Sequence, residues 1–173
     1  MKKTILLTLI LAAGLAWAWG EEVKVQANTP FAYAYLECSG PYQQIPVKIG
    51  QFIQEFFKQN VAPAGAMFGL YLNSPQQVAS QAELKWRIGF PVGSDAKILE
   101  PLKKAEFSFP LVAYYLHTGP FETVAGSYSK IMQYLETNGY KVVGPCLERY
   151  LDNPAMVKPE QQRTEILFPV EKI

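Results

Sequence analysis

Tyrosines and carboxylates are the side chains of this sequence that could bind or transform another molecule. Eight candidate binding residues fall in segments with the composition of β-strands, and they are Tyr33, Tyr35, Tyr71, Arg87, Tyr114, Glu148, Tyr150 and Glu165. The faces of tyrosine rings attract cationic or planar compounds, and a half-buried glutamate can neutralise a positive charge. The pattern favours a tyrosine-rich groove that captures a hydrophobic or cationic organic ligand, with Glu165 as the central carboxylate.

Residue sets for metal binding and for familiar catalytic mechanisms are missing. The chain has one histidine, His117, and two cysteines, Cys38 and Cys146, so a zinc site of four Cys and His ligands cannot form. No Gly-x-Ser-x-Gly motif occurs, and a single histidine gives no evident Ser-His-Asp or Cys-His set. We therefore expect no metal, no cofactor and no catalytic residues. Hydrolysis with Glu165 as general base and a groove tyrosine as proton donor stays open as an alternative.

The composition is that of an ordinary globular domain. The 173 residues are 49% hydrophobic and 18% charged, which gives no sign of disorder or of a fibrous protein. A chain of this size buries roughly two-thirds of its unfolded surface, so its core needs no metal or disulfide scaffold. A formal net charge of +1 provides no broad positive field, and we expect no nucleic-acid partner. A protein partner at an open sheet face or edge remains an alternative to a small molecule.

The first residues form a targeting segment. A positively charged start precedes an apolar run over residues 4–15 and a small-x-small cleavage site at residues 16–18. This pattern predicts a signal peptide over residues 1–18, a lead-in over residues 19–30, and a periplasmic or secreted protein. The apolar run is short for a bilayer span, so a retained N-terminal anchor is the alternative. No later apolar stretch approaches the ~20 residues of a membrane helix, so we expect no stable membrane span after cleavage.

The rest of the chain contains an internal repeat at a shift of about 79 residues. The aligned segments are residues 34–42 (AYLECSGPY) and 113–121 (AYYLHTGPF), 71–75 and 150–154, and, after a one-residue slip, 90–92 and 168–170. A chance match would not keep glycines, prolines and aromatic residues in one order over so many positions. We therefore predict one ligand-binding domain over residues 31–173, made of a first repeat at about 31–92 and a second at about 109–170.

Each repeat has the pattern of a strand, a helix and a hairpin. A β-rich run, residues 31–38 or 109–117, stops at a Gly-Pro that ends the strand and opens a helix. Apolar residues at helical spacing follow, such as Ile49, Phe52 and Phe56. Two β-like runs then complete each repeat. Together they predict an α+β fold of duplicated β-α-β-β units, in which one antiparallel sheet carries two helices on one face and an open ligand groove on the other.

Alternation along the strands separates the two faces of this sheet. In the last strand the more apolar set, which includes Ile166 and Phe168, should face the helices, and Glu165 should face the groove. All eight candidate binding residues are expected on the groove side. Cys38 is expected toward the helices and Cys146 toward the groove, which disfavours a disulfide between them. In the alternative interpretation, Glu165 lies at an exposed edge and the tyrosines cover a solvated sheet.

With these motifs in this order, the chain resembles the GyrI-like small-molecule-binding family, which also forms the effector-binding domain of AraC-type and MerR-type transcription regulators. The resemblance rests on the Gly-Pro before each helix, on CLERYLDNP at residues 146–154 and on TEILFPV at residues 164–170. It covers nearly all of the chain after the signal segment. It implies the same two-layer, duplicated, SOUL-like fold.

The resemblance also implies a binding role. In similar proteins an acidic residue on the last strand contacts ligands that are frequently lipophilic cations, and Glu165 matches that position. Relatives joined to a helix-turn-helix domain regulate transcription, whereas we expect this chain to act as an exported stand-alone domain. Some similar proteins hydrolyse strained cyclopropane compounds with a groove glutamate. Haem-binding SOUL proteins share a related fold. If this chain bound haem, His117, its one histidine, would be the axial ligand.

Overall fold

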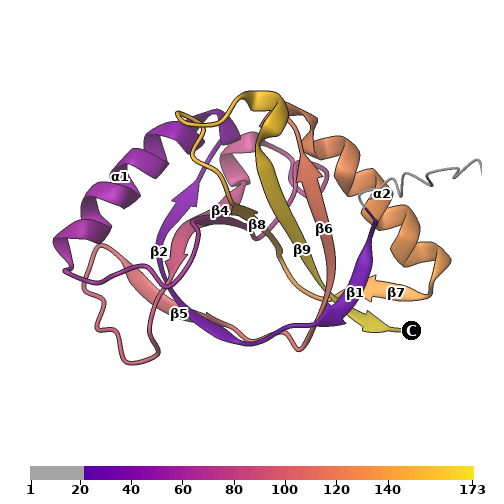
Figure 1. Ribbon diagram of the computed structural model, residues 1–173, viewed down its shortest axis with the longest axis horizontal. Coiled ribbons are helices and arrows are strands. Elements are labelled where there is room, and N and C mark those ends of the chain that lie inside the picture. The colour runs from indigo at the N-terminus through magenta and orange to yellow at the C-terminus, as the bar shows by residue number, and fades with distance from the viewer. Residues whose placement is uncertain (1–21) are drawn as a thin grey trace, which may run out of the picture.

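The computed structural model describes residues 22–173, so the predicted signal peptide lies outside the described residues. Figure 1 shows the described strands and helices along the chain. The strands are β1 (Lys24–Ala27), β2 (Phe31–Ser39), β3 (Phe68–Tyr71), β4 (Lys85–Pro91), β5 (Lys103–Phe107), β6 (Leu111–Thr118), β7 (Tyr140–Val142), β8 (Cys146–Tyr150) and β9 (Arg163–Lys172). The helices are α1 (Ile45–Lys58) and α2 (Val124–Thr137), entered through the short turns η1 (Tyr42–Gln44) and η3 (Phe121–Thr123).

The spacing of these elements bears out the duplication. Helix α1 begins at Ile45 and α2 at Val124, 79 residues later, and both helices are 14 residues long. Strand β4 begins at Lys85 and β9 at Arg163, 78 residues later. The one-residue slip of the aligned sequences therefore falls in the loops before these two strands.

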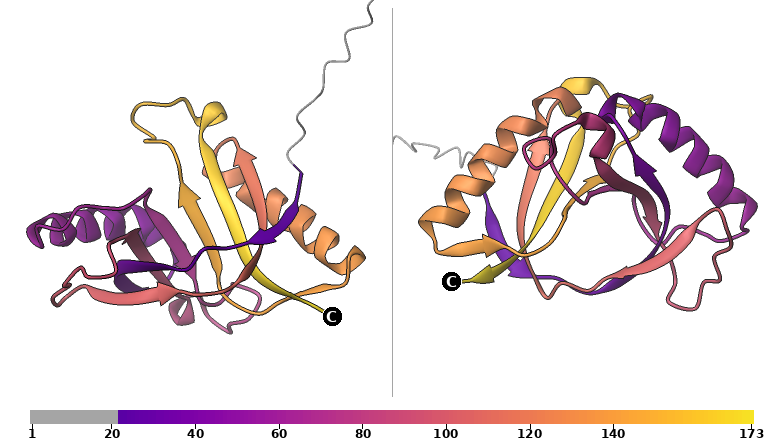
Figure 2. Two further views of the ribbon diagram at one scale, coloured as in Figure 1. Left: turned by 60° about the horizontal axis from the view of Figure 1, so that its bottom comes forward. Right: turned by 180° about the vertical axis from the view of Figure 1, so that it is seen from behind.

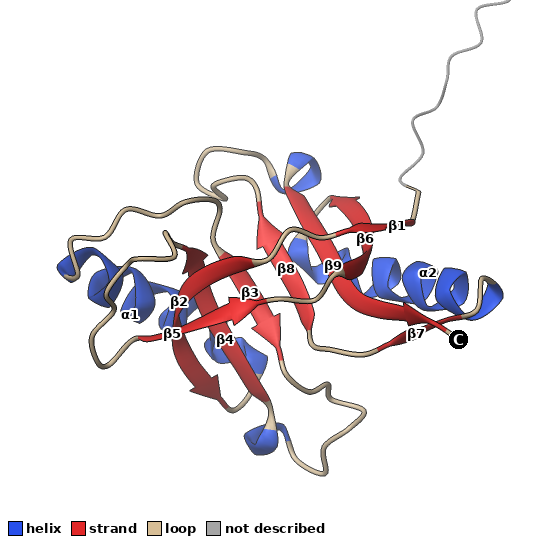
Figure 3. Ribbon diagram, turned by 90° about the horizontal axis from the view of Figure 1, so that it is seen from below, coloured by secondary structure: helices blue, strands red, loops and turns tan. Residues whose placement is uncertain are grey.

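One antiparallel sheet runs through both repeats. Its strand order is β1-β6-β9-β8-β3-β4-β2-β5, and β7 pairs with β9. The repeats join where β3 pairs with β8, in the middle of the sheet. Figure 3 shows the strands from below, with both helices behind them. The predicted α+β fold, one antiparallel sheet with two helices on one face, is confirmed.

Each helix covers its own half of the sheet. The apolar stripe of α1 buries Phe52 and Phe56 in a cluster with Trp86. The stripe of α2 buries Ile131 in a separate cluster with Ile166. The helices contact β2, β4, β6 and β7, and Figure 3 shows the central strands β3 and β8 between them. In the view from behind in Figure 2, the two helices diverge from each other. Two diverging helices therefore leave the middle of the sheet uncovered on their own side.

The face of the sheet away from the helices is packed. Its apolar cluster includes residues that are at most 3% exposed, namely Tyr33, Phe68, Phe107, Leu147 and Leu167. Figure 1 shows that the sheet is strongly curved. Two connecting segments meet where Asn28 donates to the carbonyl oxygens of Phe109 and Pro110 at 2.8 and 2.9 Å. The predicted position of the groove on this face is therefore corrected, because the curvature of the sheet fills that face with its own side chains.

Within residues 22–173, no helix is long and apolar enough to cross a bilayer.

Candidate functional site

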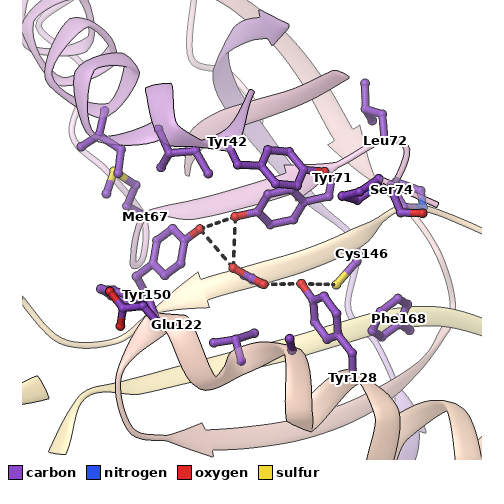
Figure 4. A pocket seen from close by; sticks show the side chains of 18 of the residues that line it. Tyr42, Met67, Tyr71, Leu72, Ser74, Glu122, Tyr128, Cys146, Tyr150 and Phe168 are labelled. Carbon is purple, nitrogen blue, oxygen red and sulfur yellow. Dashed lines mark hydrogen bonds between the residues drawn. The ribbon is translucent and has the colours of Figure 1, made fainter. Parts of the chain in front are cut away.

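A cleft of about 1790 Å³ opens between α1 and α2, on the helix side of the sheet. The uncovered strands β3 and β8 form its floor, and apolar residues of the two helices, such as Ile49 and Val124, form its walls. Figure 4 shows Tyr71, Tyr150 and Tyr128 directed toward one another in this cleft. The site therefore combines residues of both repeats.

The register of β8 places Glu148 on the cleft floor. Glu148 pairs with Ile166 on β9, and Ile166 packs beneath α2. Directly paired residues of antiparallel strands project to the same face, so Glu148 also faces the helices. Cys146 and Tyr150, two residues before and after Glu148, lie on the same face of β8. Tyr71 of β3 pairs directly with Cys146, so its side chain projects to that face as well.

Glu148 is the centre of a hydrogen-bonded network and is 8% exposed. The hydroxyls of Tyr71 and Tyr150 donate to its Oε2 at 3.1 and 3.3 Å, and these two hydroxyl oxygens are 2.9 Å apart. Tyr128 of α2 donates to Oε1, and the Cys146 thiol donates to the Tyr128 hydroxyl with a sulfur–oxygen distance of 3.6 Å. The donors converge on one carboxyl group, and they can stabilise its ionised form.

Burial sets the protonation of this network. It raises the pKa of Glu148, and the hydrogen bonds from the three tyrosines oppose that increase. It also raises the pKa of Tyr71, Tyr128 and Tyr150, so these hydroxyls remain neutral donors. The pKa of Cys146 is raised by burial as well, so its sulfur is a thiol. A positive group entering the cleft would favour the ionised carboxylate.

Glu165 lies on the opposite face of the sheet, away from this cleft. Its carboxylate accepts a hydrogen bond from Arg149 Nη1 at 2.6 Å and another from the Tyr114 hydroxyl at 3.4 Å. The sequence prediction that Glu165 and Ile166 lie on different faces of the sheet is therefore confirmed. The negative charge of Glu165 is balanced by the Arg149 guanidinium, whereas Glu148 has only neutral donors among the hydrogen bonds described above.

Arg87, Tyr33 and Tyr35 form a second group on that opposite face. Arg87 donates to the Tyr33 hydroxyl at 2.8 Å, and its guanidinium carbon lies 4.3 Å from the centre of the Tyr35 ring. The structure therefore brings three of the eight candidates together at the cleft and separates the other five from it. The three at the cleft are Tyr71, Glu148 and Tyr150. A ligand-binding role remains a prediction for all eight.

The helix residues are the part of the site that sequence reasoning missed. Tyr128 occupies the position that aligns with Ile49 in the first repeat, so a hydroxyl stands within an otherwise apolar stripe. The difference between Ile49 in the first repeat and Tyr128 in the second is the sequence feature that could have indicated a role for Tyr128. Tyr42, before α1, also lines the cleft and donates to the carbonyl oxygen of Asn73 at 3.0 Å. Burial raises the pKa of Tyr42 to about 12.

His117 is buried, with both ring nitrogens close to polar partners. Nδ1 lies 2.9 Å from Ser127 Oγ and Nε2 lies 3.2 Å from Thr123 Oγ1, so neither nitrogen projects into an open coordination position. Both cysteines are free and buried, and both lie on the helix side, with Cys38 under α1 and Cys146 at the cleft. Opposite faces for these two cysteines were therefore predicted wrongly. In residues 22–173, no group of three or more His, Cys, Asp or Glu residues could hold a metal.

Several solved structures share this fold. The C-terminal domain of EcmrR has a TM-score of 0.77 and 20% identity, over 88% of this chain and 99% of that one. A hydrolase from Listeria innocua has a TM-score of 0.64 and 14% identity, over 87% of this chain and 92% of that one. SAV2435, bound to tetraphenylphosphonium, has a TM-score of 0.59 and 16% identity, over 87% and 94% of the two chains. At these identities the likeness concerns the fold alone. No curated protein matches the chain significantly.

Family membership follows from a match along the chain. The family model of the GyrI-like small molecule binding domain matches residues 21–171, which include almost every residue that the structure describes. The two helices, the cleft between them and all of the duplicated sheet except Lys172 at the end of β9 fall within that range. This chain belongs to the family of GyrI-like small molecule binding domains.

Proposed function

We propose that this protein is exported and captures a hydrophobic or cationic organic molecule in the cleft between α1 and α2, with Glu148 as the central carboxylate. One observation carries the proposal. Among the described residues that line the cleft, the charged ones are Glu122, Glu148 and Asp152, and all three are acidic. A cleft with apolar walls and acidic groups, without a lysine or arginine among those lining residues, suits a ligand that brings the positive charge itself.

Burial makes the charge of the ligand matter. A carboxylate removed from water is costly unless an opposite charge or hydrogen bonds stabilise it. Hydrogen bonds from three neutral tyrosines do most to stabilise the Glu148 carboxylate, and an electrostatic contribution from His117 is smaller. Rings near the carboxylate add faces that attract cations. Tyr42 and Tyr71 meet edge to face with centroids 5.3 Å apart, and Phe121 meets Tyr150 in the same way at 5.6 Å.

A structural neighbour supports the same class of ligand by analogy. SAV2435 is bound to tetraphenylphosphonium, a bulky aromatic cation, in its solved structure. The export part of the proposal is supported by the sequence of residues 1–18. It is tested by fractionating cells that express the full chain and determining the N-terminus of the protein. Cleavage near residue 18 supports export, and an uncleaved cytoplasmic protein contradicts it.

The binding proposal is tested by calorimetric titration of the purified protein with tetraphenylphosphonium. The wild type and Glu165→Gln are expected to bind with similar affinity, and Glu148→Gln is expected to lose at least about tenfold. Glu165→Gln is the matched control because it removes a carboxylate from the other face of the same sheet. Equal binding by Glu148→Gln and the wild type would show that Glu148 has no such role.

Hydrolysis is a second candidate, favoured by the raised pKa of Glu148. A carboxyl group whose pKa is moved toward neutrality can act as a general base, and the Tyr71 hydroxyl, 3.1 Å from it, is a neutral hydrogen-bond donor beside it. A hydrolase from Listeria innocua shares the fold. Incubation with a strained cyclopropane electrophile separates the two functions. Turnover that is abolished in Glu148→Gln supports hydrolysis, and tight binding without turnover supports a binding protein.

A further inference from the structure

We infer that the cleft selects an elongated ligand with one cationic end, and that it binds this ligand in a single orientation. The cationic end lies against the second repeat, at Glu148, and the apolar remainder extends along α1 of the first repeat. The inference rests on the proposed cation-binding function and names the kind of cation.

The acidic groups of the cleft all come from the second repeat. Each of them aligns with an uncharged residue of the first repeat at the shift of 79 residues that relates α1 to α2. The aligned pairs are Glu122 with Gln43, Glu148 with Gly69, and Asp152 with Asn73. Since α1 and α2 form opposite walls, this difference in sequence gives the cleft one acidic side and one neutral side.

One branch of the hydrogen-bonding network around Glu148 follows the same division, although Tyr71 of the first repeat also donates to its carboxylate. Tyr128 and Cys146 form one branch of its network, and they align with Ile49 and Met67, which also line the cleft. A hydroxyl and a thiol on the second repeat thus correspond to a branched alkyl chain and a thioether on the first. At these two positions the first repeat therefore lacks the polar atoms that the second repeat places in the cleft.

Of the three acidic residues, Glu148 is the one that lies deepest. Glu122 is exposed, and Asp152 is ion-paired with Arg163 at 2.8 Å. A cationic group is therefore drawn past the mouth of the cleft to the buried carboxylate. Because the carboxylate that binds the cationic group lies on the α2 side, the opposite, neutral side is the surface that we assign to the rest of the molecule.

The neutral side offers a continuous apolar surface for that remainder. Ile45, Ile49 and Ile53 follow one another along α1 at helical spacing, and all three line the cleft. The volume of about 1790 Å³ exceeds the ~300–1,000 Å³ of pockets that enclose one drug-sized molecule. A compact cation at Glu148 would leave part of the α1 wall in water, whereas an alkyl chain attached to the cation would cover it.

Calorimetric titration with alkylamines of six to twelve carbons, kept below micelle-forming concentrations, tests the inference. Affinity is expected to rise roughly two- to fourfold with each methylene. The α,ω-diamine of ten carbons is expected to bind at least about tenfold more weakly than decylamine, because its second charge would lie against the apolar wall. Alkyl sulfates of equal length are expected not to bind.

Tetraphenylphosphonium separates failure of this inference from failure of the proposed function. If it binds while affinity for the amines is independent of length, or while the diamine binds as well as decylamine, the single orientation is wrong and cation binding stands. If neither tetraphenylphosphonium nor any amine binds, the proposed function itself is contradicted.

Two variants at aligned positions test whether the alkyl chain of the ligand extends along α1 or along α2. Ile53 and Met132 align between the repeats, line opposite walls, and are 36% and 39% exposed, so serine at either position should leave the fold intact. Ile53→Ser is expected to remove most of the increase in affinity that longer alkylamines give. Met132→Ser is expected to remove much less of that increase. Equal losses, or a larger loss in Met132→Ser, would overturn the orientation.

Discussion

Gly69 lies directly opposite Glu148 where β3 pairs with β8, and two tyrosine hydroxyls fill the space above it. A Cβ atom at residue 69 would lie 2.7 Å from the Tyr150 hydroxyl oxygen and 3.1 Å from that of Tyr71. Because Gly69 of the first repeat has no side chain, the two tyrosine hydroxyls can reach the carboxylate of Glu148 in the second repeat.

Gly69→Ala should displace the tyrosine hydroxyls from Glu148. Overpacking of this kind lowers the free energy of unfolding by about 1–3 kcal/mol, and the loss of hydrogen bonds should weaken cation binding as well. Urea denaturation and calorimetric titration measure the two effects. Gly50→Ala in α1 is the control, because its Cβ would meet nothing within 4 Å and helical alanine is about 0.5–1 kcal/mol more stable than glycine. Equal stability of Gly69→Ala and the wild type would contradict the contact.

The raised pKa of Glu148 predicts a pH-dependent stability. Between its ordinary value of 4.5 and the raised value, the folded chain holds a proton that the unfolded chain has lost. Stability therefore falls as pH rises through this window, by at most about 1.4 kcal/mol per pH unit, and then levels off. The neighbouring Cys146, Tyr71, Tyr128 and Tyr150 titrate at higher pH because burial raises each pKa.

Denaturant titrations of the wild type and Glu148→Gln across pH 4 to 8 isolate this contribution, because glutamine carries no proton to lose. The difference in unfolding free energy between the two proteins should change with pH in the stated direction. A difference that does not change with pH would mean that Glu148 has the same pKa in the folded and the unfolded chain.

Tyr128→Phe should leave the ring in place and remove one donor from the carboxyl group. The ring keeps its edge-to-face contact with Phe168, at 5.4 Å between centroids, whereas Oε1 of Glu148 loses its bond. We expect a loss of about 1–3 kcal/mol in stability and a further increase in the pKa of Glu148, since less remains to favour its ionised form. The pH dependence of stability should extend to higher pH. An unchanged profile would show that the Tyr128 hydroxyl does not act on the carboxyl group.

The packing of α1 predicts opposite results for two neighbouring phenylalanines. Phe52 is fully buried in the first-repeat core, whereas Phe57 is 58% exposed. Phe52→Ala should lower the free energy of unfolding by about 3–5 kcal/mol. Phe57→Ala should change it by less than about 1 kcal/mol. Thermal and chemical denaturation measure both, and similar losses would contradict the placement of α1.

Much of the fold could be predicted from the sequence because the repeat aligned strands, turns and helices twice. Alternation also separated the faces of individual strands correctly, as for Glu165 against Ile166. These features are local, since they depend on the period of a strand or a helix.

The side of the groove could not be predicted in the same way. Alternation shows that Glu148 and Leu147 face opposite sides, but only the pairing of β8 with β9 shows which side is which. The polar character of Glu148 and Tyr150 suggested a face away from the helices. The helices diverge, however, and leave β3 and β8 uncovered, so polar residues there face a cleft on the helix side. Divergence of helices is a tertiary property that no local pattern records.

A crystal structure of the protein with tetraphenylphosphonium is the most direct test of a binding site between the helices. Density for the cation between α1 and α2, over the carboxylate of Glu148, is the predicted result. Density on the opposite face, beside Glu165 and Arg149, would contradict the account.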